Sequence, residues 1–134
     1  MRDERLTLIG QTADDLPAIS ALLQDATLRV ADAAWDRRGR RFVLLVNRYR
    51  WESTTSSRVR SALRIETVAA VQRQKWPAEP DAVLNLLSLA LDGEALVLTF
   101  ATGTALRVKT EVIEVVLEDL DAPWATDRVP KHPV

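Results

Sequence analysis

The chain has 134 residues, a formal net charge of −1 at pH 7, 47% hydrophobic residues and 28% charged residues, which is typical of one globular domain. It has no cysteine, so its side chains supply no disulfide, thiol nucleophile or thiolate metal ligand. No apolar run approaches the roughly 18 residues of a membrane span, and acidic residues stand near the N-terminus where a secretory signal is basic. We therefore expect a single cytoplasmic domain over residues 1–134, with an irregular, proline-containing tail over 122–134 and no membrane partner.

The chain begins with the pattern of a short strand followed by a helix. Apolar and polar residues alternate over 4–9, and a glycine ends this predicted strand. Side chains with capping oxygens follow at 12–15, and the next apolar residues share one helical stripe. Because Pro17 is tolerated only in the first helical turn, the predicted cap lies near Ala13 or Asp14.

The middle of the chain has the pattern of paired strands. Residues 27–35 and 41–51 are predicted to form the two arms of a β-hairpin around a turn at 36–40. Residues 58–72 form the longest predicted strand, and its alternation shifts at 68–71, which indicates a β-bulge or a bend.

The last third predicts a second hairpin and a closing helix. Residues 83–91 suit a helix or a strand, but the Asp92-Gly93 turn signal and the evident strand after it favour a hairpin arm. A further turn and strand follow. The spacing then changes to that of a helix, which we expect over 111–121, with an apolar stripe formed by Val112, Ile113, Val116, Leu117 and Leu120.

These elements predict an α+β fold that is mainly β. Seven antiparallel strands and a C-terminal helix have the outline of a pleckstrin-homology-like split barrel, in which the helix plugs the open end. The early helix between the first two strands departs from that outline. An α+β sandwich with both helices on one sheet face is the alternative.

Several segments in order carry a resemblance to a known family: LLQDA at 22–26, NRYRWE at 47–52, RSALR at 60–64, PDAVLNLL at 80–87 and PWAT at 123–126. At these segments the chain resembles an uncharacterised family of short alphaproteobacterial proteins that is known only as a domain of unknown function (DUF 2948). The resemblance implies a bacterial cytoplasmic protein. It implies no activity and supplies no catalytic residues.

The sequence lacks the residue patterns of catalytic, cofactor and metal sites. His132 is the only histidine and lies in the proline-rich tail. Asp14 and Asp15 suit a helix N-terminus, and the acids of the predicted last helix suit a solvated face. The glycines are isolated, whereas phosphate loops need clustered ones. We therefore expect no cofactor, no metal and no enzymatic activity.

Arginine is the one residue type whose pattern indicates binding. From Arg29 to Lys75 there are twelve basic residues against four acidic ones, a local charge of +8 that leaves −9 elsewhere. If the strands on either side of the 52–57 loop pair, arginines and a tryptophan could gather on one surface. The candidate partner- or anion-binding residues are Arg48, Arg50, Trp51, Arg58, Arg60 and Arg64. A solvated sheet face, with some arginines paired to acids of the last helix, is the other interpretation.

Three classes of function remain open. The favoured one is a small non-catalytic binding or adaptor module that engages a protein partner, as a monomer or homodimer. The alternative is anion or nucleic-acid binding through the arginine-rich face, with Trp35, Tyr49 and Trp51 as stacking residues. Nucleic acid is disfavoured because the rest of the chain is acidic. An enzyme that uses carboxylates or arginines alone is the third.

Overall fold

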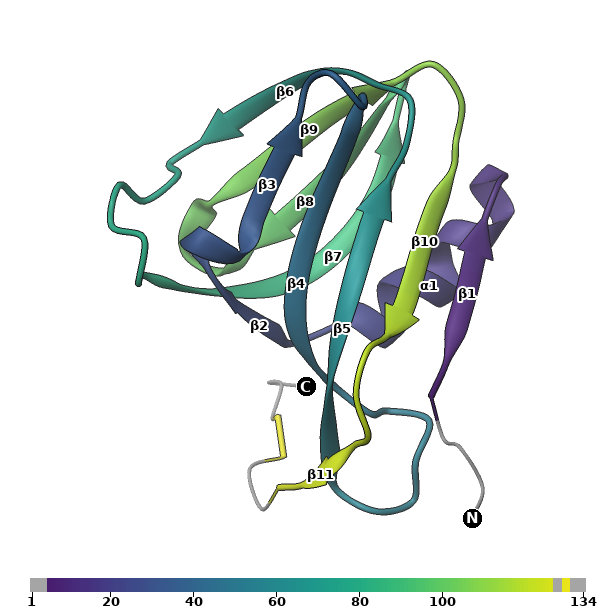
Figure 1. Ribbon diagram of the computed structural model, residues 1–134, viewed down its shortest axis with the longest axis vertical. Helices are drawn as coiled ribbons and strands as arrows, with labels where there is room; N and C mark the ends of the chain where they lie inside the picture. Colours follow the sequence, from purple (N-terminus) through teal and green to yellow (C-terminus); the bar gives the residue numbers. More distant parts are fainter. Residues whose placement is uncertain (1–4, 127–128, 131–134) are drawn as a thin grey trace.

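The structure is a computed structural model that describes residues 5–126 and 129–130. These residues form a strongly curled antiparallel sheet and one short α-helix (Figure 1). The helix α1 is Leu16–Leu23. Three 3₁₀ turns are present: η1 (Ala13–Asp15), η2 (Val30–Asp32) and η3 (Ala101–Gly103). The strands are β1 (Thr7–Gly10), β2 (Ala26–Arg29), β3 (Ala33–Asp36), β4 (Arg41–Tyr49), β5 (Ser57–Ile65), β6 (Val68–Gln74), β7 (Val83–Asp92), β8 (Ala95–Phe100), β9 (Ala105–Thr110), β10 (Val115–Asp119) and β11 (Trp124–Ala125).

The strands form a sheet in the order β1-β10-β5-β4-β2-β7-β8-β9-β6, with β3 paired to β4 and β11 paired to β5. The sheet curls around the core but does not close (Figure 1). Among the described strands, β3 pairs only with β4 and β6 pairs only with β9. One edge of each strand is therefore left unpaired, and this break in the wall positions the site described below.

The core lies inside the curl, and α1 packs against β7 beside it. Leu16, Ile19 and Leu23 form the buried face of the helix, as the apolar stripe predicted. The Ser20 hydroxyl accepts the Leu89 N–H at 2.9 Å, next to an irregularity in the β7–β8 register. The early helix and both predicted hairpins are confirmed, and residues 83–91 form a strand.

The predicted closing helix over 111–121 is wrong, because its central residues form β10. This strand is inserted between β1 and β5, with Leu117 opposite Leu8 on one side and Leu63 on the other. Val115, Leu117 and Asp119 are buried with the period of two of a strand. Val116 is also apolar and nearly buried, which produced the helical spacing in the sequence. β-branched residues and two long-range ladders decide in favour of the strand.

The strand count of seven is wrong as well, since the structure has eleven strands in its described residues. The 27–35 arm divides into β2 and β3 around η2, and the 58–72 strand divides into β5 and β6 at Thr67, whose φ is +52°. A bulge follows at Val68/Ala70, where one was predicted. The mainly-β antiparallel class is confirmed. Without a C-terminal helix in the described part of the chain, the structure does not support the pleckstrin-homology-like outline or the two-helix sandwich.

The tail returns to the body through β11, where Trp124 pairs with Arg58. His132 lies outside the described residues.

Candidate functional site

The predicted arginine surface forms only in part. β4 and β5 pair as expected, but their register places Arg48 opposite Val59, whereas Arg58 lies opposite Tyr49 and Arg60 opposite Asn47. Residues directly opposite each other share a face of the sheet, so Arg48 points to the other side from Arg58, Arg60 and Arg64. Arg48 continues the inward-facing row of β4 and is fully buried.

Arg48 is held by two carboxylates. Its Nε and Nη2 donate to the two oxygens of Asp119 at 3.0 and 2.9 Å, and its Nη1 and Nη2 donate to Glu52 at 2.9 and 2.7 Å. Asp119 also accepts the Ser61 hydroxyl at 2.7 Å and the Leu6 N–H at 2.9 Å. The network therefore joins β4, β5, β10 and the segment before β1, and it leaves Arg48 unable to meet an external anion.

The electrostatics of this network agree with a structural role. Burial alone would raise the pKa of the Asp119 carboxyl, but hydrogen bonds from Arg48, Ser61 and the Leu6 N–H hold that pKa below its ordinary value. The pKa of Glu52 is likewise lowered, since hydrogen bonds and charge from Arg48 outweigh its burial. Burial opposes the charge of Arg48, yet both carboxylates raise its pKa, so the ion pairs stay charged at neutral pH.

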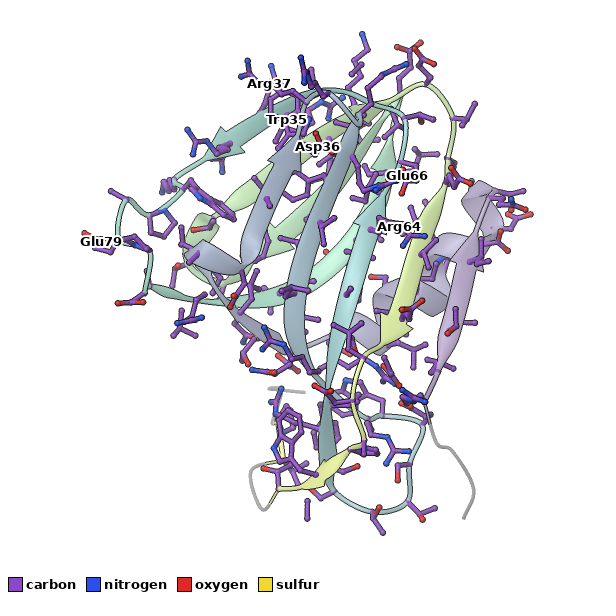
Figure 2. The ribbon with its side chains drawn as sticks, viewed as in Figure 1. Trp35, Asp36, Arg37, Arg64, Glu66 and Glu79 are labelled. Atoms are coloured by element: carbon purple, nitrogen blue, oxygen red, sulfur yellow. The ribbon has the colours of Figure 1, made fainter. Side chains whose placement is uncertain are left out.

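The other predicted site residues also make internal contacts. Arg50 is nearly buried and donates to the Ser57 hydroxyl at 2.9 Å, and the Trp51 indole donates to the Gln24 carbonyl at 2.8 Å. Arg58 donates to backbone carbonyls at positions 25 and 47. Arg64 forms an ion pair with Glu66 at 2.7 Å, and Figure 2 shows these two side chains at the end of β5. Arg60 is half-buried on the same face as Arg58.

A different site lies where the curled sheet fails to close. The unpaired edges of β3 and β6 border a cleft of about 240 Å³. One end is closed by the Val68 N–H, which donates to the Arg40 carbonyl at 2.8 Å. Near η2, the N–H groups of Val30 and Ala31 donate to the carbonyls at 82 and 80 at 2.9 Å. The first bond ties the turn after β3 to the start of β6, and the other two tie the segment before β3 to the loop that precedes β7.

The cleft combines an apolar floor with basic and aromatic walls. Its lining residues are Ala33, Trp35, Arg37, Phe42, Val71, Arg73, Trp76 and Leu106. The Arg37 guanidinium lies 4.5 Å from the centre of the Trp35 ring, and Trp76 packs edge-on against Phe100 at 5.8 Å. Figure 2 shows Trp35 and Arg37 at the end of the β3–β4 hairpin, close to β6.

Two polar features of the cleft are uncompensated in the described part of the chain. The Trp35 Nε1 atom is buried and has no hydrogen-bond acceptor. Arg37 and Arg73 form no ion pair with a described residue, whereas Arg40 on the neighbouring turn and Arg41 at the start of β4 are paired with Glu111 and Glu66. Buried indole N–H groups normally have an acceptor, so this arrangement is suited to an anionic group.

Sequence reasoning found this site only in pieces. Trp35 was expected to stack on a ligand, whereas Arg37 was not among the candidate binding residues. Trp35 and Trp51 lie near opposite ends of β4, however, so Trp35 is separated from the other two predicted stacking residues, Tyr49 and Trp51, whose rings contact each other edge-on at 4.7 Å. Trp76 and Arg73 carried no signal, since their approach to β3 depends on which strand edges remain unpaired.

A family model described as "Protein of unknown function (DUF2948)" matches residues 6–132. The chain belongs to this family. The resemblance seen in the sequence segments is therefore confirmed, and the DUF2948 description assigns no activity. No functionally curated protein and no solved structure matches the chain.

Two further observations concern metal binding and membrane-spanning helices. Within residues 5–126 and 129–130, no group of three or more His, Cys, Asp or Glu side chains is placed to hold a metal ion. None of the helices formed by those residues has the length and apolar character needed to cross a membrane.

Proposed function

We propose that the chain is a non-catalytic binding module that engages a protein partner through the cleft between β3 and β6. One observation carries this proposal: two unpaired strand edges face each other across a cleft with an apolar floor and exposed basic side chains. Such edges offer free backbone N–H and C=O groups, which extended segments of other proteins use to pair with a sheet.

The composition of the two edges favours pairing with an added strand. β6 has seven residues and contains no proline, so beyond the bulge at Val68/Ala70 its free side can take part in a ladder. β3 is shorter, and its exposed Ala34 offers little steric hindrance. Phe42 and Leu106 below the edges are buried apolar residues, which would pack against an inserted side chain.

Two observations support a role without catalysis. The described carboxyl groups with a clear pKa shift are Asp15, Glu52 and Asp119, and in each the pKa is lowered rather than raised toward neutrality. A carboxyl group that acts as a general acid or base near neutral pH works best with a pKa raised toward that pH. The residues that line the cleft include no serine, histidine or carboxylate among those described. Anion binding through the predicted arginine face has less support, because Arg48 and Arg64 are each paired with carboxylates.

The test is affinity purification from native cell extract with the tagged full chain and two charge-reversal variants. Arg73→Glu changes the cleft, and Arg60→Glu is the matched control on the arginine face. We expect a stoichiometric protein that is retained by the wild-type chain and Arg60→Glu and lost with Arg73→Glu, and whose purified form binds the chain directly. A partner lost only with Arg60→Glu, or no partner under any condition, would contradict the proposal.

A further inference from the structure

Building on the proposed function, we infer that the partner presents an extended segment whose Asp or Glu carboxylate enters the cleft between Arg37 and Arg73 and accepts the Trp35 indole N–H.

The charge of the cleft is the first support. Of its described lining residues two are arginines and none is acidic. The nearest acid along the chain, Asp36, is engaged in its own turn, where it accepts the Gly39 N–H at 2.9 Å. Glu66 and Glu111 are committed to Arg41 and Arg40. Asp36, Glu66 and Glu111 are thus occupied within the fold, which leaves Arg37 and Arg73 available to an anion from outside.

The indole of Trp35 is the second support, and it is independent of charge. Its Nε1 is buried and unpaired in the free chain, so the indole has to turn toward the cleft to meet an incoming carboxylate, whereas the same group of Trp51 already has a backbone acceptor at 2.8 Å. An indole N–H only donates, so its partner must be an acceptor. A carboxylate has two oxygens and several lone pairs, which lets it accept from the indole and from a guanidinium together.

The floor of the cleft specifies a second residue of the segment. Phe42 and Leu106 are buried, and Val71 and Trp76 are half-buried beside them. In an extended chain, residues two positions apart point to the same side. A volume of about 240 Å³ holds side chains rather than a folded surface. The segment that fits therefore has an acidic residue two positions from an apolar one.

A random nine-residue peptide display library, selected against the full chain, tests the inference. We expect the enriched peptides to share an Asp or Glu two positions from an apolar residue. Replacing that acid by its amide should weaken binding about tenfold, which is the effect of one charge-assisted hydrogen bond. Arg73→Gln should weaken binding of the acidic peptide about tenfold while changing the affinity for the amide peptide little. Arg60→Gln, as a control, should change neither.

Other outcomes would contradict the carboxylate, the cleft or the extended segment separately. Neutral peptides that bind as tightly as acidic ones, and compete with the natural partner, would overturn the carboxylate while leaving the cleft as the binding site. Enriched peptides that bind the Arg73→Gln variant as tightly as the Arg60→Gln control would place the binding site outside the cleft. That result would contradict the proposed function as well. Failure to enrich any peptide, with free glutamate shifting the Trp35 resonance instead, would replace the segment by a small carboxylate ligand. Failure of both probes would also overturn the inference. Thermal unfolding of each variant confirms that its fold is retained.

Discussion

Replacing Asp119 by alanine is expected to lower the free energy of unfolding by about 3–5 kcal/mol, the usual effect of removing one partner from a buried ion pair. The loss is large because Arg48 is fully buried and would keep its charge with only Glu52 to oppose it, since the Asp119 side chain is 1% exposed and that of Glu52 is 34% exposed. The Ser61 hydroxyl and the Leu6 N–H would lose their acceptor as well.

Urea unfolding measures this effect, and Glu118→Ala is the matched control on the same strand. Glu118 is exposed, so its removal should change the free energy of unfolding by less than about 0.5 kcal/mol. Combining Asp119→Leu with Arg48→Met should recover part of the loss, because no buried charge is then left unpaired although the Ser61 hydroxyl and the Leu6 N–H still lack their acceptor. A loss below about 1 kcal/mol for Asp119→Ala would show that the pair is not buried as described.

The same network gives stability a pH dependence of defined sign. The pKa values of Asp119 and Glu52 are lowered in the folded protein, so their contribution is fully present above the unfolded values near pH 4 and is lost as pH falls through the folded ones. The urea concentration at the unfolding midpoint should therefore decrease as the pH is lowered below about 4. The decrease should be less steep in Asp119→Asn. Parallel pH profiles for the two proteins would refute this.

Replacing Leu117 by alanine is expected to cost about 2–5 kcal/mol, the range for truncating a fully buried leucine. Leu117 is 0% exposed and stands in the middle of β10, opposite residues of β1 and β5. Its truncation would leave a cavity in the core beneath β10, where β10 pairs with β1 and β5. The effect should appear as a lower urea midpoint with little change in slope.

The Val112→Ala variant distinguishes strand β10 from the helix over 111–121 that the sequence predicted. On a helix over 111–121, Val112 and Leu117 share the apolar stripe, so both truncations should be costly. In the structure Val112 is 58% exposed and lies before β10, so its truncation should cost less than about 0.5 kcal/mol. Equal losses for the two variants would contradict the structure.

Local patterns predicted the elements whose environment is local. Pro17 and its neighbours specify the start of α1, and Gly93, with a φ of +62°, permits the tight turn between β7 and β8. The segment around Leu117 failed because its apolar spacing fits a helix, while its strand conformation depends on β1 and β5, which are far away in sequence. Long-range pairing of this kind leaves little trace in a single sequence.

The candidate site was predictable in part for a related reason. Phe42, Leu44 and Val46 mark the inward face of β4, and extending their alternation by one step would have placed Arg48 inside. Its partner Asp119 was assigned to the predicted closing helix rather than to a strand, so no buried ion pair was expected. The cleft could not be predicted from the sequence, because its position depends on which strand edges of the folded sheet remain unpaired.

The Trp35 indole N–H provides the most direct test that the cleft binds the partner. In a proton–nitrogen correlation spectrum of the full chain, assigned with Trp35→Phe, titration with the purified partner should move the Trp35 indole resonance downfield as it gains an acceptor. The Trp51 indole, which already donates to the Gln24 carbonyl, should stay in place. A bound partner that leaves the Trp35 resonance unmoved would contradict the cleft as the binding site.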